Sequence, residues 1–182
     1  MTDTISPWVR RYAPLVPGGA VLDLACGSGR HSRHLASLGH AVVAVDRDPA
    51  ALAAAAGPDI STSAIDLEQE GAAWPFGPDR FAGIVVTNYL HRPLIADMLG
   101  SLAANGVLIY ETFADGNAQF GKPSNPAFLL QPGELLEWAL QHGLRVVAFE
   151  DGVIDAPKAA MVQRLCAVKP GFPRVAALLP PF

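Results

Sequence analysis

The feature of the sequence that most restricts the fold is an apolar run ending in a glycine turn, Val21-Leu22-Asp23-Leu24-Ala25-Cys26-Gly27-Ser28-Gly29-Arg30. The apolar residues predict a central parallel strand that is covered on both faces. Gly27 and Gly29 permit a sharp turn with no Cβ between the backbone and a ligand. A helix that begins at Arg30 presents its free N–H groups to the same crevice. Because ligands of open α/β sheets bind beyond the carboxyl ends of the strands, the stretch predicts a binding site as well as a fold.

The residues around this turn distinguish two kinds of ligand. Dinucleotide sites use three glycines, G-x-G-x-x-G, whereas this sequence has Ser32 at the third position. Asp23 stands shortly before Gly27, where a carboxylate suits an ammonium group and repels a pyrophosphate. A second apolar run, Ala41–Val45, ends in Asp46 at the spacing of an acid that holds ribose hydroxyls. The pattern favours an amino-acid-like ligand that carries a ribose.

These motifs, Asp23-x-x-x-Gly27-x-Gly29 and then Val43-Ala44-Val45-Asp46, resemble the cofactor half of the class I S-adenosylmethionine-dependent methyltransferases. Later segments extend the resemblance in the family's order: Ser63–Leu67 with its acid after the third strand, Phe81–Tyr89 as the fourth strand and Asn105–Glu111 as the fifth. The closing half, with Tyr110-Glu111-Thr112-Phe113, Phe128-Leu129-Leu130 and Pro132-Gly133-Glu134-Leu135, resembles small bacterial methyltransferases of the tellurite-resistance type. The resemblance implies a doubly wound, Rossmann-like α/β fold, a three-layer αβα sandwich whose mostly parallel sheet includes an antiparallel C-terminal strand.

Length and composition predict one domain over residues 1–182, since the chain is 51% apolar and long enough for one substantial core. A net charge of −4 with no basic run argues against a large nucleic-acid substrate. Cys26 and Cys166 have no metal-ligand spacing and predict reduced thiols. No apolar run approaches the length of a signal core or membrane span. We therefore expect a cytoplasmic protein, either a monomer or a homodimer.

Two irregular segments flank the expected site. Residues 1–19 include a short helix with Ser6 as its cap, and they either pack over the sheet or form a lid on the cofactor crevice. Residues 114–131 form a long connection at the carboxyl end of the fifth strand, so they are expected to form a wall of the substrate site.

The resemblance gives three strand-end acids a role each. It implies that Asp23 faces the methionine ammonium directly or through water, that Asp46 accepts both ribose hydroxyls and that Asp66 accepts the adenine amino group. A structural strand-end acid and a solvated loop acid are the competing interpretations of Asp23 and Asp66. Arg47 lies along the adenine face or forms an exposed salt bridge. The complete set of expected cofactor-binding residues is Asp23, Ala25, Cys26, Gly27, Gly29, Arg30, Asp46, Arg47, Asp66, Leu67 and Asn88.

Methyl transfer requires mainly that the nucleophile, the methyl carbon and the sulfur are close and aligned. Asn88 and Tyr89 lie at the end of the fourth strand, next to the expected methyl position. They lack the two prolines of the Asn-Pro-Pro-aromatic signature of enzymes that methylate the exocyclic amines of nucleic-acid bases. His91 titrates near neutrality, so His91 and Tyr89 are the candidate catalytic residues, with a structural histidine as the alternative. Arg92 either holds an anionic substrate or pairs with an acid such as Glu111.

No metal site is expected. His31 and His34 are three positions apart on the first crossover helix, but two ligands without a third favour a solvated helix face. The sequence thus predicts transfer of a methyl group from S-adenosylmethionine, which becomes S-adenosylhomocysteine, to a small molecule. The alternatives are a nicotinamide-dependent (NAD(P)-binding) oxidoreductase and an S-adenosylmethionine-binding module without catalysis.

Overall fold

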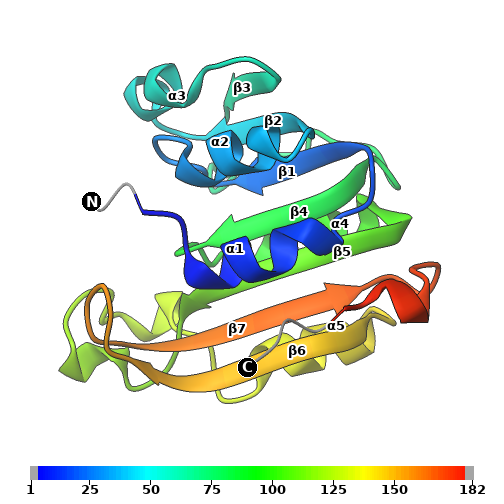
Figure 1. Ribbon diagram of the computed structural model, residues 1–182. Helices are drawn as coiled ribbons and strands as arrows, with labels where there is room; N and C mark the ends of the chain where they lie inside the picture. The colour runs from blue at the N-terminus through cyan, green and yellow to red at the C-terminus, as the bar shows by residue number, and fades with distance from the viewer. Residues whose placement is uncertain (1–3, 179–182) are drawn as a thin grey trace.

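One mixed sheet organises residues 4–178, the part of the chain that the computed structural model describes. Its seven strands are β1 (Ala20–Leu24), β2 (Ala41–Asp46), β3 (Ile60–Ala64), β4 (Phe81–Thr87), β5 (Leu102–Phe113), β6 (Arg145–Ile154) and β7 (Ala160–Val168). Their order across the sheet is β3-β2-β1-β4-β5-β7-β6 (Figure 1). Only β7 runs against its neighbours, β5 and β6, which confirms the expected antiparallel C-terminal strand.

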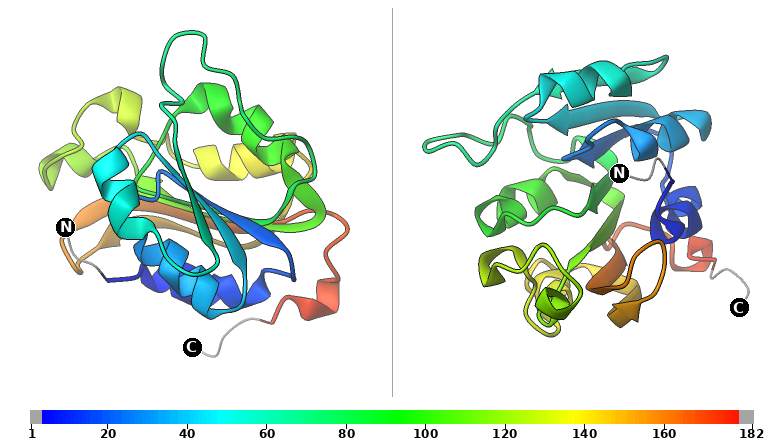
Figure 2. Two further views of the ribbon diagram at one scale, coloured as in Figure 1. Left: turned by 90° about the horizontal axis from the view of Figure 1, so that it is seen from above. Right: turned by 90° about the vertical axis from the view of Figure 1, so that its left-hand side faces the viewer.

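Helices cover both faces of the sheet, so the three-layer doubly wound architecture is confirmed (Figure 2). The α-helices are α1 (Pro7–Tyr12), α2 (Arg30–Ser37), α3 (Pro49–Ala55), α4 (Ile95–Gly100) and α5 (Glu134–Gln141). Short 3₁₀ turns lie at Ala13–Leu15, Arg92–Leu94, Asn117–Gln119, Pro126–Phe128 and Arg174–Ala176. α1 and α2 pack on one face around Tyr12 and Leu35, whereas α4 and α5 pack on the other around Met98 and Leu135. No helix in residues 4–178 is long and apolar enough to cross a membrane.

The fourth crossover differs from the sequence-based expectation. The apolar pattern from Pro93 to Leu102 predicts one helix, but the α-helix covers only Ile95–Gly100 and Leu102 already begins β5. Gly100 and Ser101 allow the early stop, and the chain then pairs Leu102 with Phe81 before the register shifts. Thus β5 is longer than the expected strand, Asn105–Glu111, and begins almost directly after α4.

The N-terminal segment packs on the sheet, which is one of its two expected roles, and its role as a lid on the cofactor crevice stays a prediction. α1 packs on the sheet through the buried residues Trp8, Val9 and Tyr12. The Ser6 hydroxyl caps this helix, accepting from the Trp8 N–H at 3.1 Å, and Trp8 Nε1 donates to the Leu165 carbonyl at 3.2 Å. Residues 4–7 line the larger of the two pockets described below. Residues 1–3 of this segment lie outside the described part of the chain.

Gly29 is required by packing between helices, and its expected close approach to a ligand stays a prediction. Its φ is +77°, and an added Cβ would lie 2.5 Å from the Ala55 Cβ and 2.7 Å from the Ala55 Cα. A glycine therefore allows the start of α2 to pack directly against the end of α3. Gly27 differs, because a Cβ added there would meet no atom within 4 Å.

We predict that Gly29→Ala lowers the free energy of unfolding by about 2–5 kcal/mol, the sum of left-handed backbone strain and overpacking. Gly143→Ala is a matched control, because its φ is +67° and its added Cβ meets nothing within 4 Å. The control should lose only the backbone contribution, about 1–2 kcal/mol. Urea unfolding of both variants measures the difference. Equal losses would show that the contact between α2 and α3 does not require a glycine.

Candidate active site

Two pockets lie at the carboxyl ends of the central strands. The smaller has a volume of about 140 Å³ and the larger about 390 Å³. Tyr89 lines the smaller pocket and the preceding residue, Asn88, lines the larger, so both pockets reach the end of β4. The strand order places the smaller pocket over β1, β2 and β3, and the larger over β4, β5 and β7.

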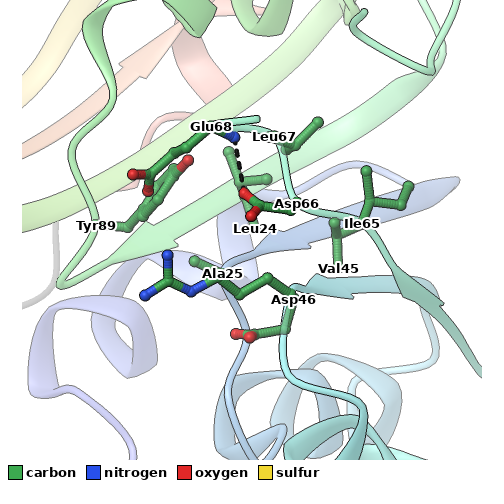
Figure 3. A pocket seen from close by; sticks show the side chains of 10 residues that line it. Leu24, Ala25, Val45, Asp46, Ile65, Asp66, Leu67, Glu68 and Tyr89 are labelled. Carbon is green, nitrogen blue, oxygen red and sulfur yellow. Dashed lines mark hydrogen bonds between the residues drawn. The ribbon is translucent and has the colours of Figure 1, made fainter. Parts of the chain in front are cut away.

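The smaller pocket combines an apolar floor with acids (Figure 3). It is lined by Leu24, Ala25, Val45, Asp46, Arg47, Ile65, Asp66, Leu67, Glu68 and Tyr89. The Asp46 carboxylate accepts from the Gly27 N–H at 2.8 Å and the Asp48 N–H at 2.9 Å, and Asp66 accepts from the Glu68 N–H at 3.0 Å. Since a carboxylate has about four acceptor positions, both acids retain capacity for a ligand. Apolar walls with two convergent carboxylates fit the base and ribose hydroxyls of a nucleoside.

Asp23 lies behind the glycine turn. It is 1% exposed and lines neither pocket, and its carboxylate accepts from the Ser32 hydroxyl at 2.6 Å. Burial raises the pKa of Asp23 to about 6, against the opposing effects of the Ser32 hydrogen bond and the Arg30 charge. The serine at the third glycine position of the turn therefore has a structural reason, because it donates to this buried acid.

Of the other turn residues, Ala25 and Arg30 line the pockets and Cys26 is buried. Ala25 lines the smaller pocket with a φ of +54°, a left-handed conformation that is uncommon for alanine. Cys26 is buried in a small apolar cluster with α3, and burial raises the pKa of its thiol to about 12. Arg30 lines the larger pocket, and its guanidinium donates to the Thr4 carbonyl at 3.2 Å.

The two candidate catalytic residues lie apart. Tyr89 lines the smaller pocket, where burial, followed by the nearby Glu68 carboxylate, raises the pKa of its phenol, so the group stays protonated at neutral pH. His91 lines neither of the two pockets. It lies in a separate depression beside Trp74 and Asp97. The structure therefore does not bring His91 into either of the two pockets.

Glu111 is the acid of the larger pocket, and its partner differs from the one considered in the sequence. It forms an ion pair with Arg164, its register partner on β7, and it accepts from the Ser6 hydroxyl at 2.9 Å. Sequence reasoning identified Glu111 but missed Arg164. The alternation along β7 was the available signal, because Arg164 follows Val162 at the period of one face.

His31 is buried, so the predicted solvated helix face is wrong for this residue. It is 1% exposed, its Nε2 accepts from the Ser6 N–H at 3.1 Å, and its Nδ1 lies 3.3 Å from the Thr87 hydroxyl. Burial, followed by the charges of Arg30 and His34, lowers the pKa of His31 to about 3. The imidazole is neutral and ties the N-terminal segment to β4. Residues 4–178 contain no group of three potential metal ligands.

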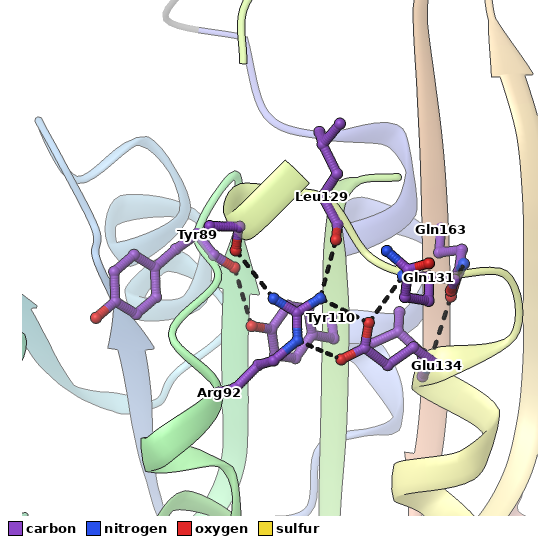
Figure 4. A network of polar contacts seen from close by, with 9 residues as sticks. Tyr89, Arg92, Tyr110, Leu129, Gln131, Glu134 and Gln163 are labelled. Atoms are coloured by element: carbon purple, nitrogen blue, oxygen red, sulfur yellow. Dashed lines mark hydrogen bonds and ion pairs between the residues drawn. The ribbon is translucent and has the colours of Figure 1, made fainter. Parts of the chain in front are cut away.

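Arg92 pairs with Glu134, so the considered pairing with Glu111 is wrong (Figure 4). Its guanidinium donates to both Glu134 oxygens, at 2.7 and 2.9 Å, and to the carbonyls of Ala127 and Leu129, each at 2.9 Å. These contacts use its donors away from the larger pocket, so Arg92 is not available to an anionic substrate. They also fix the end of segment 114–131, whose two ends are joined by the Asp115 N–H and the Leu130 carbonyl at 2.8 Å.

Comparison with known proteins relates the first half of the chain and its fold to methyltransferases. Residues 21–105 match the family described as a methyltransferase domain. A comparison with curated proteins found no match.

Three solved structures illustrate the shared fold. TehB from Haemophilus influenzae has 21% identity and a TM-score of 0.74 over 92% of this chain and 63% of its own. A Mesorhizobium loti S-adenosylmethionine-dependent methyltransferase has 19% identity and a TM-score of 0.70, with coverage of 90% and 96%. The Burkholderia thailandensis 1,6-didemethyltoxoflavin-N1-methyltransferase, with bound S-adenosylhomocysteine, has 21% identity and a TM-score of 0.65, with coverage of 89% and 76%. These likenesses show that the chain shares the fold of S-adenosylmethionine-dependent methyltransferases.

We predict that Arg92→Lys lowers the free energy of unfolding by about 1–3 kcal/mol, because lysine keeps the charge but loses the forked hydrogen bonds. Hydrogen exchange of residues 114–131 should also become faster. Arg174→Lys, at an exposed position, is the control and should stay within about 0.5 kcal/mol of the parent protein. Unchanged exchange in the variant would show that Arg92 does not fix this segment.

Asp23→Asn should change how stability depends on pH. The folded-state pKa of Asp23, about 6, is raised from 3.8, so its stabilising contribution is complete below the lower value and is lost as pH rises through the higher one. Asparagine stays neutral and can still accept from Ser32. The free energy of unfolding of the variant, relative to that of the parent protein, should therefore increase between pH 4 and 8, by up to about 3 kcal/mol. Asp79→Asn, at an exposed position, controls for loss of a surface charge. A difference that is constant with pH would contradict the prediction.

Proposed function

We propose that the protein transfers a methyl group from S-adenosylmethionine, bound across the smaller pocket and the glycine turn, to a small molecule in the larger pocket. The observation that carries this proposal is that consecutive residues at the end of β4, Asn88 and Tyr89, line the larger and the smaller pocket respectively. One pocket has the acids and apolar floor that a nucleoside requires, and the other is mostly apolar. Transfer between two ligands requires this arrangement, with the reacting groups held at a shared boundary.

The proposed cofactor contacts follow the strand order. Asp46 would accept the ribose hydroxyls, Asp66 the adenine amino group, and the backbone N–H of Leu67 would donate to the base. Asp23 lines neither pocket, so it would stabilise the ammonium group indirectly. Its carboxylate would attract the ammonium group from behind the turn, either across the turn backbone or through a bridging water. The open space at Gly27 supports passage of the methionine part along the turn, because no atom lies within 4 Å of an added Cβ.

The bound cofactor supplies an electrophilic methyl group: the acceptor's lone pair forms the new bond, and the electron pair of the broken C–S bond stays on sulfur. The chain's own residues contribute position and exclusion of water. The Glu111 carboxylate is held by Arg164 and Ser6, and the Tyr89 phenol is protonated at neutral pH. We therefore infer that alignment dominates catalysis and that a proton on the acceptor leaves to water.

Charge and cysteine usage support two further parts of the proposal. A net charge of −4 favours a small acceptor over a nucleic acid. The named function of the Burkholderia thailandensis protein, methylation of 1,6-didemethyltoxoflavin, is an example of such an acceptor on this fold. Cys26 and Cys166 are free and buried, as suits a cytoplasmic protein. Whether it is a monomer or a homodimer stays a prediction.

Calorimetric binding of S-adenosylhomocysteine tests the cofactor assignment. Asp46→Asn and Asp66→Asn should each weaken binding by about 10- to 100-fold, the loss of one charge-assisted hydrogen bond. Asp79→Asn is the matched control, because it removes an exposed carboxylate from the opposite end of β4. NAD should not bind. Equal binding by all variants, or binding of NAD alone, would overturn the assignment, and cofactor binding without methyl transfer to any acceptor would indicate a non-catalytic module.

A further inference from the structure

The larger pocket carries a charge opposite to that of the whole chain. Its lining includes four basic residues, Arg30, Lys122, Lys158 and Arg164, and one acidic residue, Glu111. The chain as a whole has a net charge of −4. Basic side chains are thus concentrated in one pocket of an acidic protein, where they raise the local concentration of anions.

Of the four basic residues, Glu111 offsets mainly the charge of Arg164. Its ion pair is with Arg164, and both side chains are mostly buried, with 10% and 13% exposed. The Ser6 hydroxyl occupies its other oxygen at 2.9 Å. The Arg164 guanidinium and the Glu111 carboxylate therefore pair with each other in the pocket, and the other basic residues that line it are Arg30, Lys122 and Lys158.

The two lysines come from different segments that meet at the pocket. Lys122 belongs to segment 114–131, and Lys158 belongs to the connection between β6 and β7, which lies beside that segment in both views (Figures 1 and 2). A Cβ added at Gly121 would lie 3.1 Å from the Lys158 Nζ, so this ammonium rests against the residue next to Lys122. Neither lysine takes part in an ion pair within the described residues 4–178.

We propose that the methyl acceptor is an amphipathic anion, an apolar body that ends in a carboxylate or similar oxyanion, and that Lys122 and Lys158 bind its charged end. This assignment rests on the proposed methyltransferase function and adds the substrate class. The apolar body would lie against Phe113, Phe120 and Val162, which line the same pocket. The volume of about 390 Å³ lies in the range of small-molecule sites.

The position of the lysines orients the acceptor. Asn88 lines the pocket at the end of β4, beside the cofactor pocket, whereas the lysines belong to the segments after β5 and β6. The anionic end therefore lies over β7 and the reacting end over β4. The lysines act as point charges on flexible stems, so they select charge and position without dictating the shape of the oxyanion.

The test uses the fluorescent apolar sulfonate 8-anilinonaphthalene-1-sulfonate on the full chain saturated with S-adenosylhomocysteine. Competition with 4-phenylbutyrate, phenyl phosphate and the neutral 4-phenylbutyramide separates charge from apolar contact. Either anion should displace the probe, and the amide should compete at least tenfold less well. Lys122→Gln and Lys158→Gln should each weaken binding of 4-phenylbutyrate about fivefold, as expected of exposed ion pairs, and the double variant by tenfold or more.

Lys169→Gln is the matched control, because it removes the same charge just after the opposite end of β7. It should bind the probe and 4-phenylbutyrate as the parent protein does. Equal competition by the amide, or unchanged binding in the double variant while S-adenosylhomocysteine still binds, would overturn the substrate class alone. Failure of the parent protein to bind S-adenosylhomocysteine would instead overturn the proposed function, and this inference with it.

Discussion

Burial of β1 and β4 on both faces is the constraint on which the rest of the structure depends. Leu22, Ile84 and Val85 are inaccessible to solvent, so these strands have no exposed face on which to carry polar function. Polar groups can be placed only where the strands end. At those ends the chain turns through left-handed residues, Ala25 after β1 and Asn88 after β4. These two residues follow adjacent strands, and each lines one of the two pockets, so they mark backbone strain at the site.

The features that could be predicted from the sequence are those set by local pattern. Asp46 and Asp66 each come at or just after the end of a short run of strand-forming residues. Because parallel strands end at the same edge of the sheet, the sequence alone indicates that both acids lie at one site, and both line the smaller pocket. The same reasoning placed Asp23 at a strand end but not behind the turn, because strand position does not specify which face a side chain takes. Gly29 was recognised as a turn residue, whereas its contact with Ala55 depends on how two helices meet.

The features that could not be predicted are long-range pairings between charged or polar residues. Arg92 had several acids as plausible partners, and its choice of Glu134 is determined by the path of a loop and a helix some forty positions away. Arg164 reaches Glu111 only through the antiparallel register of β5 and β7. His31 is buried because the N-terminal segment covers it, and that segment is tied to the same network through Ser6. Each pairing requires the assembled sheet, so a short window of sequence can indicate the face that a side chain takes but not its partner.

The strand order also separates charge across the proposed site. Acids stand at the ends of β1 and β2 and just after β3, whereas basic side chains gather over β7 and the segments that follow β5 and β6. A positively charged acceptor pocket repels a cationic cofactor when the pocket holds no anion. An anionic acceptor reverses that repulsion, so the two ligands favour each other's binding, and the coupling acts on both equally. Methyl transfer removes the charge from sulfur, which ends the attraction and favours release of the methylated product.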